Sequence, residues 1–386
     1  VPQNFYAGLG KYPLLAIPMF VLVGSIFDRS GVALRLVNFA VAIVGRGPGM
    51  LPLVAISVAM FMGGISGSGP ATAAAVGGVM IAAMSRAGYP AAFSASVVAA
   101  ASSTDILIPP SIAFIVYSVL VSGASVPALF AAGMFPGVLA GLALIIPAVW
   151  LSRRHRMGQN ESSEPRPPFW RSLREASWGL LAPVVILGGM RMGWFTPTEA
   201  AVVAVFYGLF VGMVVHRTIG LRDLYEILRE AGELSAVILI VVSLAGIFAF
   251  SLSTLGVIDP VTNAIVHSGL GEWGVMGCIL VLLLIMGMFL DGISIMLIFV
   301  PLMMPILRHY QWDVVWFGTI LVLCIAIGQF TPPMAVNLMV SSKIAQVRME
   351  STTRWVLWMV LAMTLATLLV VAFPQISLWL PAKLGY

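Results

Sequence analysis

Long apolar segments recur along almost the whole chain, and they restrict its fold more than any other feature. Examples are PLLAIPMFVLVGSIF from Pro13, AVILIVVSLAGIFAF from Ala236 and MGCILVLLLIMGMFL from Met276. Each can cross a hydrocarbon core of about 30 Å, or half of it where Gly or Pro interrupts the segment. Of the 386 residues, 60% are hydrophobic and only 9% are charged, a balance that soluble domains do not have. The sequence therefore predicts an all-α membrane protein that crosses the bilayer many times.

The sequence lacks the signatures of enzymes and of transition-metal sites. It contains no Walker loop, no GxSxG motif and no dinucleotide fingerprint, so we expect no ATP hydrolysis by this chain. Its histidines lie far apart, and its two cysteines, Cys278 and Cys324, stand inside apolar runs without ligand spacing. We expect no cofactor and no nucleic-acid partner. A transporter is favoured, and a membrane-embedded enzyme is the disfavoured alternative.

The orientation in the membrane follows from the basic residues. One strongly polar stretch, SRRHRMGQNESSEPRPPFWRSLRE, runs from Ser152 and is rich in arginine. Cytoplasmic loops of membrane proteins carry the Lys and Arg excess, so we place this stretch in the cytoplasm. A second polar stretch, from His216 to about residue 233, is predicted to be an amphipathic helix at the same surface. Of the two apolar segments between these stretches, one crosses the membrane and the next crosses back. A helix at about residues 234–252 then crosses outward.

Two parts of the chain share the same order of features. The matched positions are a glycine before an in-plane helix, a glycine at a hairpin and a Pro-Pro break: Gly31, Gly64 and Pro109 in the first part, Gly256, Gly292 and Pro332 in the second. Because the first part is entered from the inside and the second from the outside, they are predicted to be inverted repeats. Each repeat would contain an in-plane helix, a re-entrant hairpin, a helix broken at its Pro-Pro pair and a closing helix.

These features divide the chain into four predicted parts. They are an N-terminal scaffold helix at residues 1–30, repeat 1 at 31–152, a cytoplasmic loop with scaffold helices at 153–255, and repeat 2 at 256–386. The hairpins are expected at about 50–86 and 272–307, and the broken helices at about 90–122 and 314–342. The chain begins with Val1 and enters a hydrophobic helix near Lys11 without a signal-peptide pattern, so we expect its true start to be missing, and the family resemblance described below implies that the first helix is missing with it.

The first hairpin contains the string GGISGSGPAT, from Gly63 to Thr72. In hydrocarbon, irregular backbone survives only where protein or a water-filled cavity satisfies it. The tip is therefore predicted to present the Ser66 and Ser68 hydroxyls, free carbonyls and the N-terminus of a half-helix. Carbonyls and hydroxyls suit Na⁺, and a helix N-terminus suits an anionic group. The alternative is a small-residue interface for helix packing.

Two Pro-Pro pairs, Pro109/Pro110 and Pro332/Pro333, remove backbone donors and free the carbonyls one turn upstream. Asp105 stands just before the first pair and Asp291 at the second hairpin. An acid at membrane depth is functional by default, as a cation ligand or a proton acceptor, whereas the alternative is a carboxylate that caps a half-helix. A further string, TPTEAA from Thr196, predicts a helix start with Glu199 in its first turn.

Several strings in order resemble the large membrane (M) subunit of the tripartite ATP-independent periplasmic (TRAP) transporters. The strings are YPLLAIPMFVLVG, SGSGPATAAAVG, IPPSIAFIVY, LFAAGMFPG, FTPTEAA, GQFTPPMAVNL and FPQISLWLP, over essentially the whole chain. The resemblance implies a multi-pass elevator-type symporter of the bacterial inner membrane in which Na⁺ drives uptake of a small organic acid. It also implies two protein partners, a soluble periplasmic substrate-binding protein and a small four-helix membrane (Q) subunit.

The resemblance also implies the sites. One set of Na⁺ ligands would be Ser66, Ser68, Asp105, Ile108 and Pro109, and the other Gly287, Gly292, Gly328, Thr331 and Met334. The substrate would lie between the two hairpin tips, at Ser66, Gly67, Ser68, Pro110, Asp291, Gly292, Ser294 and Pro333.

This chain departs from the family pattern at two positions. The family usually has an acidic residue where this chain has Thr72, and a glycine where it has Asp105. A carboxylate that has moved between neighbouring elements of one site would explain both changes. A second hypothesis is a stand-alone ion-coupled symporter or antiporter of the wider ion-transporter superfamily, which would need no binding protein. The sequence does not identify the substrate.

Overall fold

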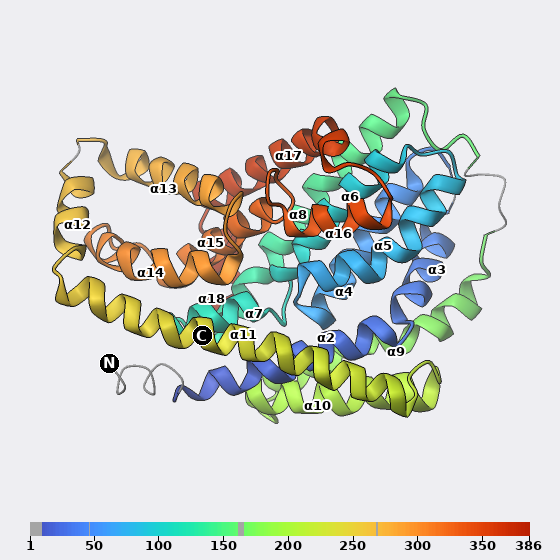
Figure 1. Cartoon of the computed structure of the whole chain (residues 1–386), viewed down its shortest axis with the longest axis horizontal. Helices are drawn as coiled ribbons and strands as arrows, with labels where there is room; N and C mark the ends of the chain where they lie inside the picture. Colours follow the sequence, from blue (N-terminus) through green and yellow to red (C-terminus); the bar gives the residue numbers. More distant parts are fainter. Residues whose placement is uncertain (1–9, 46, 161–165, 268) are drawn as a thin grey trace.

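The computed structural model describes residues 10–45, 47–160, 166–267 and 269–386, and in these residues all regular structure is helical (Figure 1). Six of the helices in these ranges are long and apolar enough to cross a membrane. This confirms the all-α, multi-span class predicted from the apolar segments. The six segments are Tyr12–Arg29, Val126–Arg154, Pro197–Val215, Leu221–Thr254, Gly292–His309 and Met349–Ala372.

The helices fall into three groups along the chain. The first group is α2 (Ala16–Arg29), α3 (Val32–Val44), α4 (Met50–Ser66), α5 (Gly69–Arg86), α6 (Ala91–Ser103), α7 (Ile112–Leu120) and α8 (Val126–Arg154). The second group is α9 (Phe169–Arg191), α10 (Pro197–Leu209) and α11 (Leu221–Thr254). The third group is α12 (Ile258–Val266), α13 (Gly271–Gly287), α14 (Gly292–His309), α15 (Val314–Gly328), α16 (Val336–Ile344), α17 (Thr353–Ala372) and α18 (Gln375–Leu384).

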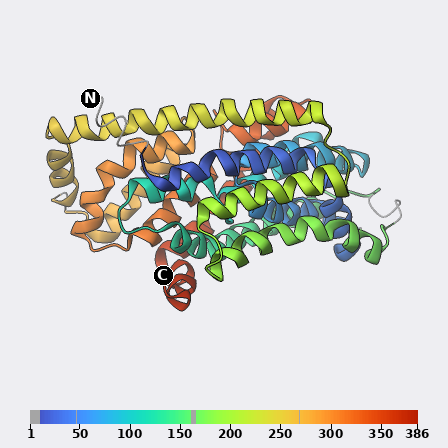
Figure 2. The same ribbon diagram turned by 90° about the horizontal axis from the view of Figure 1, so that it is seen from below.

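Helix α11 differs from the prediction. A surface helix and a separate span were expected after His216, but one continuous helix of 34 residues runs along the molecule and packs against α2 and α14 (Figures 1 and 2). Its start is capped by Asp223, whose carboxylate accepts a hydrogen bond from the Gly220 amide at 2.8 Å. The segment contains no proline, and its Leu, Glu and Arg residues are strong helix formers, so nothing locally ends the helix between its polar and apolar halves.

Helix α10 begins as its sequence predicts. The Thr196 side chain accepts from the Glu199 amide at 3.3 Å, and the Glu199 carboxylate accepts from the Thr196 amide at 2.8 Å. Pro197 occupies the first helical turn, where no amide hydrogen is needed. The predicted helix start at TPTEAA is therefore confirmed as a reciprocal capping box.

Small residues let the central helices approach closely. Helix α6 has the sequence AAFSASVVAAASS and is buried from Phe93 to Ser103. Helices α4 and α5 pack against it, and so does α16 from the third group. Ala and Ser side chains permit such close packing between membrane helices. The first and third groups of helices are therefore joined through α5, α6 and α16.

Candidate ion and substrate site

The turn between α4 and α5 packs directly on the backbone of the first Pro-Pro segment. Gly67 has φ +63°, a left-handed conformation that side chains rarely adopt. A Cβ atom at Gly67 would lie 2.6 Å from the Pro110 carbonyl oxygen. Only glycine fits this position, because the turn requires both the left-handed backbone and the close approach. The GGISGSGPAT string therefore ends one helix and brings its tip against the break after α6.

Asp105 is the polar centre of this contact. It lies in the short 3-10 turn Thr104–Ile106 that follows α6, and it is fully buried. Its Oδ2 accepts a hydrogen bond from the Thr72 hydroxyl of α5 at 2.7 Å. The backbone amides of Gly67 and Ser68 also donate to its carboxylate. Asp105 thus fixes the tip of the α4–α5 pair to the break.

Two buried oxygen atoms at this tip have no hydrogen-bond partner. They are Asp105 Oδ1 and Ser66 Oγ. A Cβ atom at Gly63 would lie 3.0 Å from Asp105 Oδ1, so the absent side chain of Gly63 leaves room beside this oxygen. Buried polar atoms in native proteins are normally paired with a partner or an ion. Both atoms are therefore available to a cation.

The remaining predicted residues of the first break line the same segment. Ile108 is partly exposed, whereas Pro109 and Pro110 are buried, and the bond between the two prolines is cis. Ser111 then caps α7 by accepting from the Phe114 amide at 3.4 Å. The backbone between Ile106 and Ser111 is thus non-helical and lies next to the hairpin turn.

The second hairpin meets the second break in a different way. A Cβ atom at Gly328 would lie 2.5 Å from the Gly287 carbonyl oxygen, so the end of α13 and the end of α15 touch backbone to backbone. The Met334 amide donates to the Met288 carbonyl at 3.2 Å, and Gly292 packs on Ile325. The structure therefore brings the predicted second set of ion ligands into one neighbourhood.

Thr331 and Asp291 form hydrogen bonds with residues of their own segments. The Thr331 hydroxyl donates to the Ile327 carbonyl at 2.6 Å. Asp291 caps α14, because its carboxylate accepts from the amides of Ile293 at 3.0 Å and Ser294 at 3.1 Å, and from the Ser294 hydroxyl. The capping alternative for Asp291 is what the structure shows. Asp291, Pro333 and Met334 are exposed.

The sequence prediction missed two polar residues where the repeats meet. A Cβ atom at Gly69, the first residue of α5, would lie 2.6 Å from Gln329 Oε1 and 2.8 Å from Asn337 Nδ2. Asn337 is buried and its Oδ1 has no partner. Both residues could have been recognised from the sequence, because they are polar side chains that flank the Pro-Pro pair in GQFTPPMAVNL.

The two hairpin pairs occupy different places. Helices α4 and α5 pack against α6, α2 and α3, whereas α13 and α14 pack against α15, α12 and α11. Figure 1 shows α13 and α14 near one end of the molecule and α4 and α5 toward the other. The first hairpin contacts its own break, and its helix α5 also packs against α16, which follows the second break.

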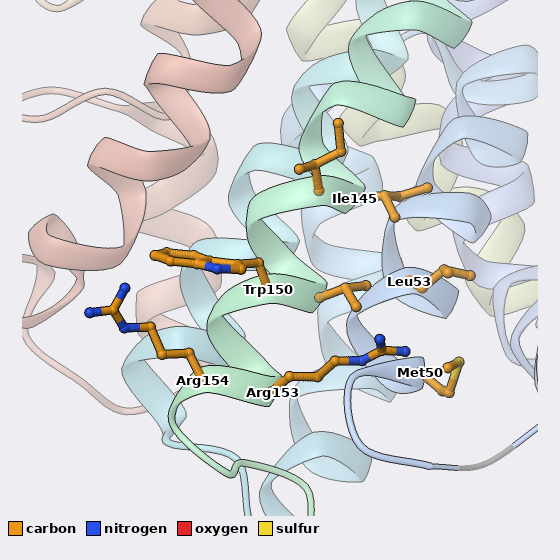
Figure 3. Close-up of a pocket in the computed structure, with 8 residues that line it drawn as sticks. Met50, Leu53, Ile145, Trp150, Arg153 and Arg154 are labelled. Atoms are coloured by element: carbon orange, nitrogen blue, oxygen red, sulfur yellow. The ribbon is translucent and has the colours of Figure 1, made fainter.

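A cavity of about 690 Å³ lies outside these contacts. It opens between α4 and α8 and is lined mainly by apolar side chains such as Leu53 and Ile145, with Arg153 and Arg154 at one end (Figure 3). The guanidinium of Arg154 stacks over the Trp150 ring at 4.9 Å. None of the predicted site residues lines this cavity. We therefore take the hairpin contacts, and not this groove, as the candidate site.

The helical fold first defines the class of protein. An all-helical chain whose described residues include six apolar helices of spanning length is a polytopic membrane protein. Residues 1–376 match the family model described as "Tripartite ATP-independent periplasmic transporter, DctM component". The chain is 38% identical to the C4-dicarboxylate TRAP transporter large permease protein of Pseudomonas aeruginosa, over 97% of this chain and 87% of that protein. The chain belongs to the DctM family of TRAP transporters, and it is a transport protein, not an enzyme.

Other comparisons extend this relationship. The sialic acid TRAP transporter large permease protein of Vibrio cholerae is 34% identical over 100% of this chain and 90% of that protein. The isethionate TRAP transporter permease protein DctMQ of Oleidesulfovibrio alaskensis is 38% identical over 97% of this chain, which spans only 58% of that protein's length. A solved structure of the Alcanivorax borkumensis YdaH transporter is similar in fold alone, with a TM-score of 0.62 at 12% identity over 100% of this chain and 87% of that one.

Proposed function

We propose that this chain is the large permease subunit of a Na⁺-coupled uptake system for a small organic anion. The names of its relatives mention C4-dicarboxylates, sialic acid and isethionate. These compounds share an anionic carboxylate or sulfonate group, which supports an acidic substrate for this chain as well.

One observation carries the proposal: each hairpin end packs backbone to backbone on a broken helix. Gly67 lies against the Pro110 carbonyl, and Gly287 lies against Gly328. Irregular backbone at such contacts leaves carbonyl oxygens that a helix does not use, and hard cations such as Na⁺ bind these oxygens. The proposed ligands are Ser66, Ser68, Asp105, Ile108 and Pro109 for the first ion, and Gly287, Gly292, Gly328, Thr331 and Met334 for the second.

The substrate site is proposed between the two tips. Helix α5 begins at Gly69, next to the first turn, and no side chain caps its N-terminus, whereas Asp291 caps the start of α14. A helix N-terminus carries partial positive charge and unpaired amides, so the start of α5 favours a carboxylate or sulfonate. The proposed substrate residues are Ser66, Gly67, Ser68, Pro110, Asp291, Gly292, Ser294 and Pro333.

The transport movement proposed is that of an elevator. The hairpins and broken helices, which are re-entrant in this proposal, would move as a unit against a scaffold of α2, α9, α10 and α11. The partners proposed are a periplasmic substrate-binding protein and a small membrane subunit, and the location is the bacterial inner membrane. The isethionate relative supports the small subunit, because its printed name joins M and Q in one permease.

The test is uptake into proteoliposomes that contain the large and small subunits. We expect C4-dicarboxylate, sialic acid or isethionate to accumulate only with an inward Na⁺ gradient and only with its binding protein added. A K⁺ gradient of equal size is the control. Uptake that does not depend on Na⁺ would overturn the proposed Na⁺ coupling. Uptake without any binding protein would favour the stand-alone symporter.

A further inference from the structure

Helix α2 presents one polar face to the first hairpin. Gly24 and Asp28 are four residues apart and therefore lie on the same face of α2. A Cβ atom at Gly24 would lie 3.1 Å from Ser66 Oγ, so this face packs directly on the end of α4. Asp28, one turn further along α2, therefore points toward the region of Gly63 and Ser66.

Asp28 and Asp105 are close enough for their carboxylates to interact electrostatically. Asp28 is partly exposed as a residue, but its Oδ1 atom is buried and has no hydrogen-bond partner. Three unpartnered buried oxygens therefore belong to one region: Asp28 Oδ1, Asp105 Oδ1 and Ser66 Oγ.

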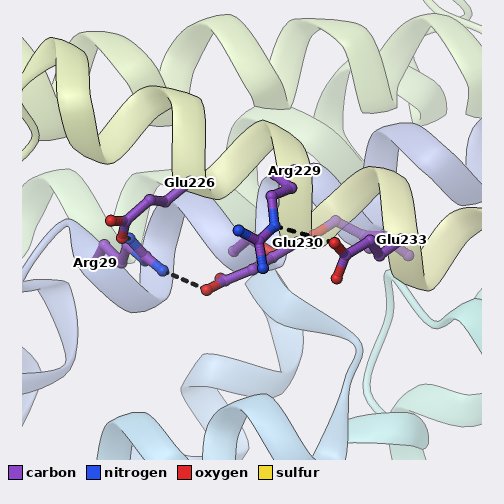
Figure 4. A network of polar contacts seen from close by, with 7 residues as sticks. Arg29, Glu226, Arg229, Glu230 and Glu233 are labelled. Carbon is purple, nitrogen blue, oxygen red and sulfur yellow. Dashed lines mark hydrogen bonds and ion pairs between the residues drawn. The ribbon is translucent and has the colours of Figure 1, made fainter.

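The nearest positive side chain is already engaged. Arg29 binds two acids of α11, Glu226 at 2.8 Å and Glu230 at 2.6 Å (Figure 4). Glu230 also interacts unfavourably with Asp28. Buried carboxylates without a counter-charge are strongly destabilising. Arg29 alone does not neutralise the region between α2 and the hairpin, so a bound cation or a proton there would stabilise it.

Gly63 allows α4 to approach Asp105 closely. It lies three residues before Ser66 on α4, and a Cβ atom there would lie 2.9 Å from the Asp105 Cα and 3.0 Å from its Oδ1. The two carboxylates and the hydroxyl are hard oxygen ligands, and they suit a hard cation such as Na⁺ when carbonyls of the break complete its shell.

We infer that Asp28 is an ion ligand that reaches the first Na⁺ site from helix α2, so that the bound ion bridges the scaffold and the first hairpin. This inference rests on the proposed Na⁺ coupling. It adds a consequence: with the ion bound, α2 and the hairpin are held together, and without it Asp28 and Asp105 repel each other. Ion occupancy would then control whether the hairpin can leave α2.

The experiment measures the thermal stability of the complete transporter in lipid nanodiscs as NaCl replaces choline chloride at constant ionic strength. A ligand that binds only the folded state stabilises it by RT ln(1 + [L]/Kd), so Tm starts to rise near the Na⁺ concentration that equals Kd. For Asp28→Asn we expect this onset concentration to rise about tenfold or more, since one full charge is lost at close range. Asp28→Glu should recover part of the affinity. Glu233→Gln, which removes an exposed acid of α11 paired with Arg229, is the matched control and should not shift it.

A double variant separates the site from general destabilisation. Asp28→Asn and Asp105→Asn combined should cost less than the sum of the single effects, because both residues serve one ion.

The outcomes distinguish this inference from the proposed function. Unchanged Na⁺ dependence in Asp28→Asn, or in Asp28→Glu if the amide variant does not fold, would overturn the role of Asp28 while leaving Na⁺-driven uptake intact. Stabilisation of the parent by CaCl₂ and not by NaCl would overturn the assignment to Na⁺. If neither the Tm nor the uptake of the parent transporter depends on Na⁺, the proposed function itself is overturned.

Discussion

The Thr72 hydroxyl donates to Asp105 Oδ2 at 2.7 Å, and this bond joins α5 to the break that follows α6. These are the two positions at which the chain departs from the pattern of the family that it resembles. Their contact supports the hypothesis that a carboxylate has moved between two neighbouring elements of one site. We therefore interpret Asp105 as the relocated acid of the first site.

The first prediction concerns moving the acidic side chain from position 105 to position 72. Asp105→Gly should raise the Na⁺ concentration for half-maximal uptake ten- to a thousandfold, since a full charge at partly buried range is worth about 1–4 kcal/mol. Thr72→Glu combined with Asp105→Gly should restore much of the affinity, because the longer acid of α5 reaches the vacated position. Na⁺ titration of uptake measures both. Parent-like transport by Asp105→Gly alone would show that the carboxylate is not a ligand.

The second prediction concerns the turn at Gly67. Gly67→Ala should lower uptake at least tenfold, because alanine disfavours φ +63° by about 1–2 kcal/mol and its Cβ would meet the Pro110 carbonyl. Gly78→Ala is the control on the same hairpin, since nothing lies within 4 Å of its added methyl. Initial rates at matched protein levels provide the measurement. Equal rates for the two variants would argue against the tip as the site.

The third prediction concerns Thr331 at the second break. Thr331→Val removes the hydroxyl that donates to the Ile327 carbonyl, so it should raise the half-maximal Na⁺ concentration severalfold while the protein still inserts. Thr331→Ser keeps the hydroxyl and is the matched control. Uptake is titrated with Na⁺ at fixed ionic strength. If valine and serine variants share the parent curve, the side chain is not part of the second site.

The fourth prediction tests the inverted topology. In a Cys278→Ser background, which removes the exposed native thiol, Gln159→Cys and Glu350→Cys should react with a membrane-impermeant maleimide only from the cytoplasmic side. His309→Cys and Tyr386→Cys should react only from outside. Intact spheroplasts and inverted vesicles provide the two sides. Labelling of residues 309 and 350 from the same side would contradict the inverted repeat.

The sequence by itself determined where helices can span and where they must stop. Apolar runs define the spans because hydrocarbon excludes charge, and the capping box at Thr196 and Glu199 starts α10 through bonds between residues three apart. The glycine at Gly67 and the Pro-Pro pair at Pro109 lie where helices are interrupted in the structure. These features are local, so the order of residues is enough to predict them.

Only the tertiary structure decided which polar atoms meet. The contact of Thr72 with Asp105, the approach of Gly69 to Gln329 and Asn337, and the approach of Gly24 to Ser66 all depend on how helices are rotated and packed. Helix rotation is set by many apolar contacts of similar energy, which no short motif encodes. For α11 the two levels divide: the lack of a helix breaker between residues 221 and 254 is local, whereas its packing against α2 depends on tertiary contacts.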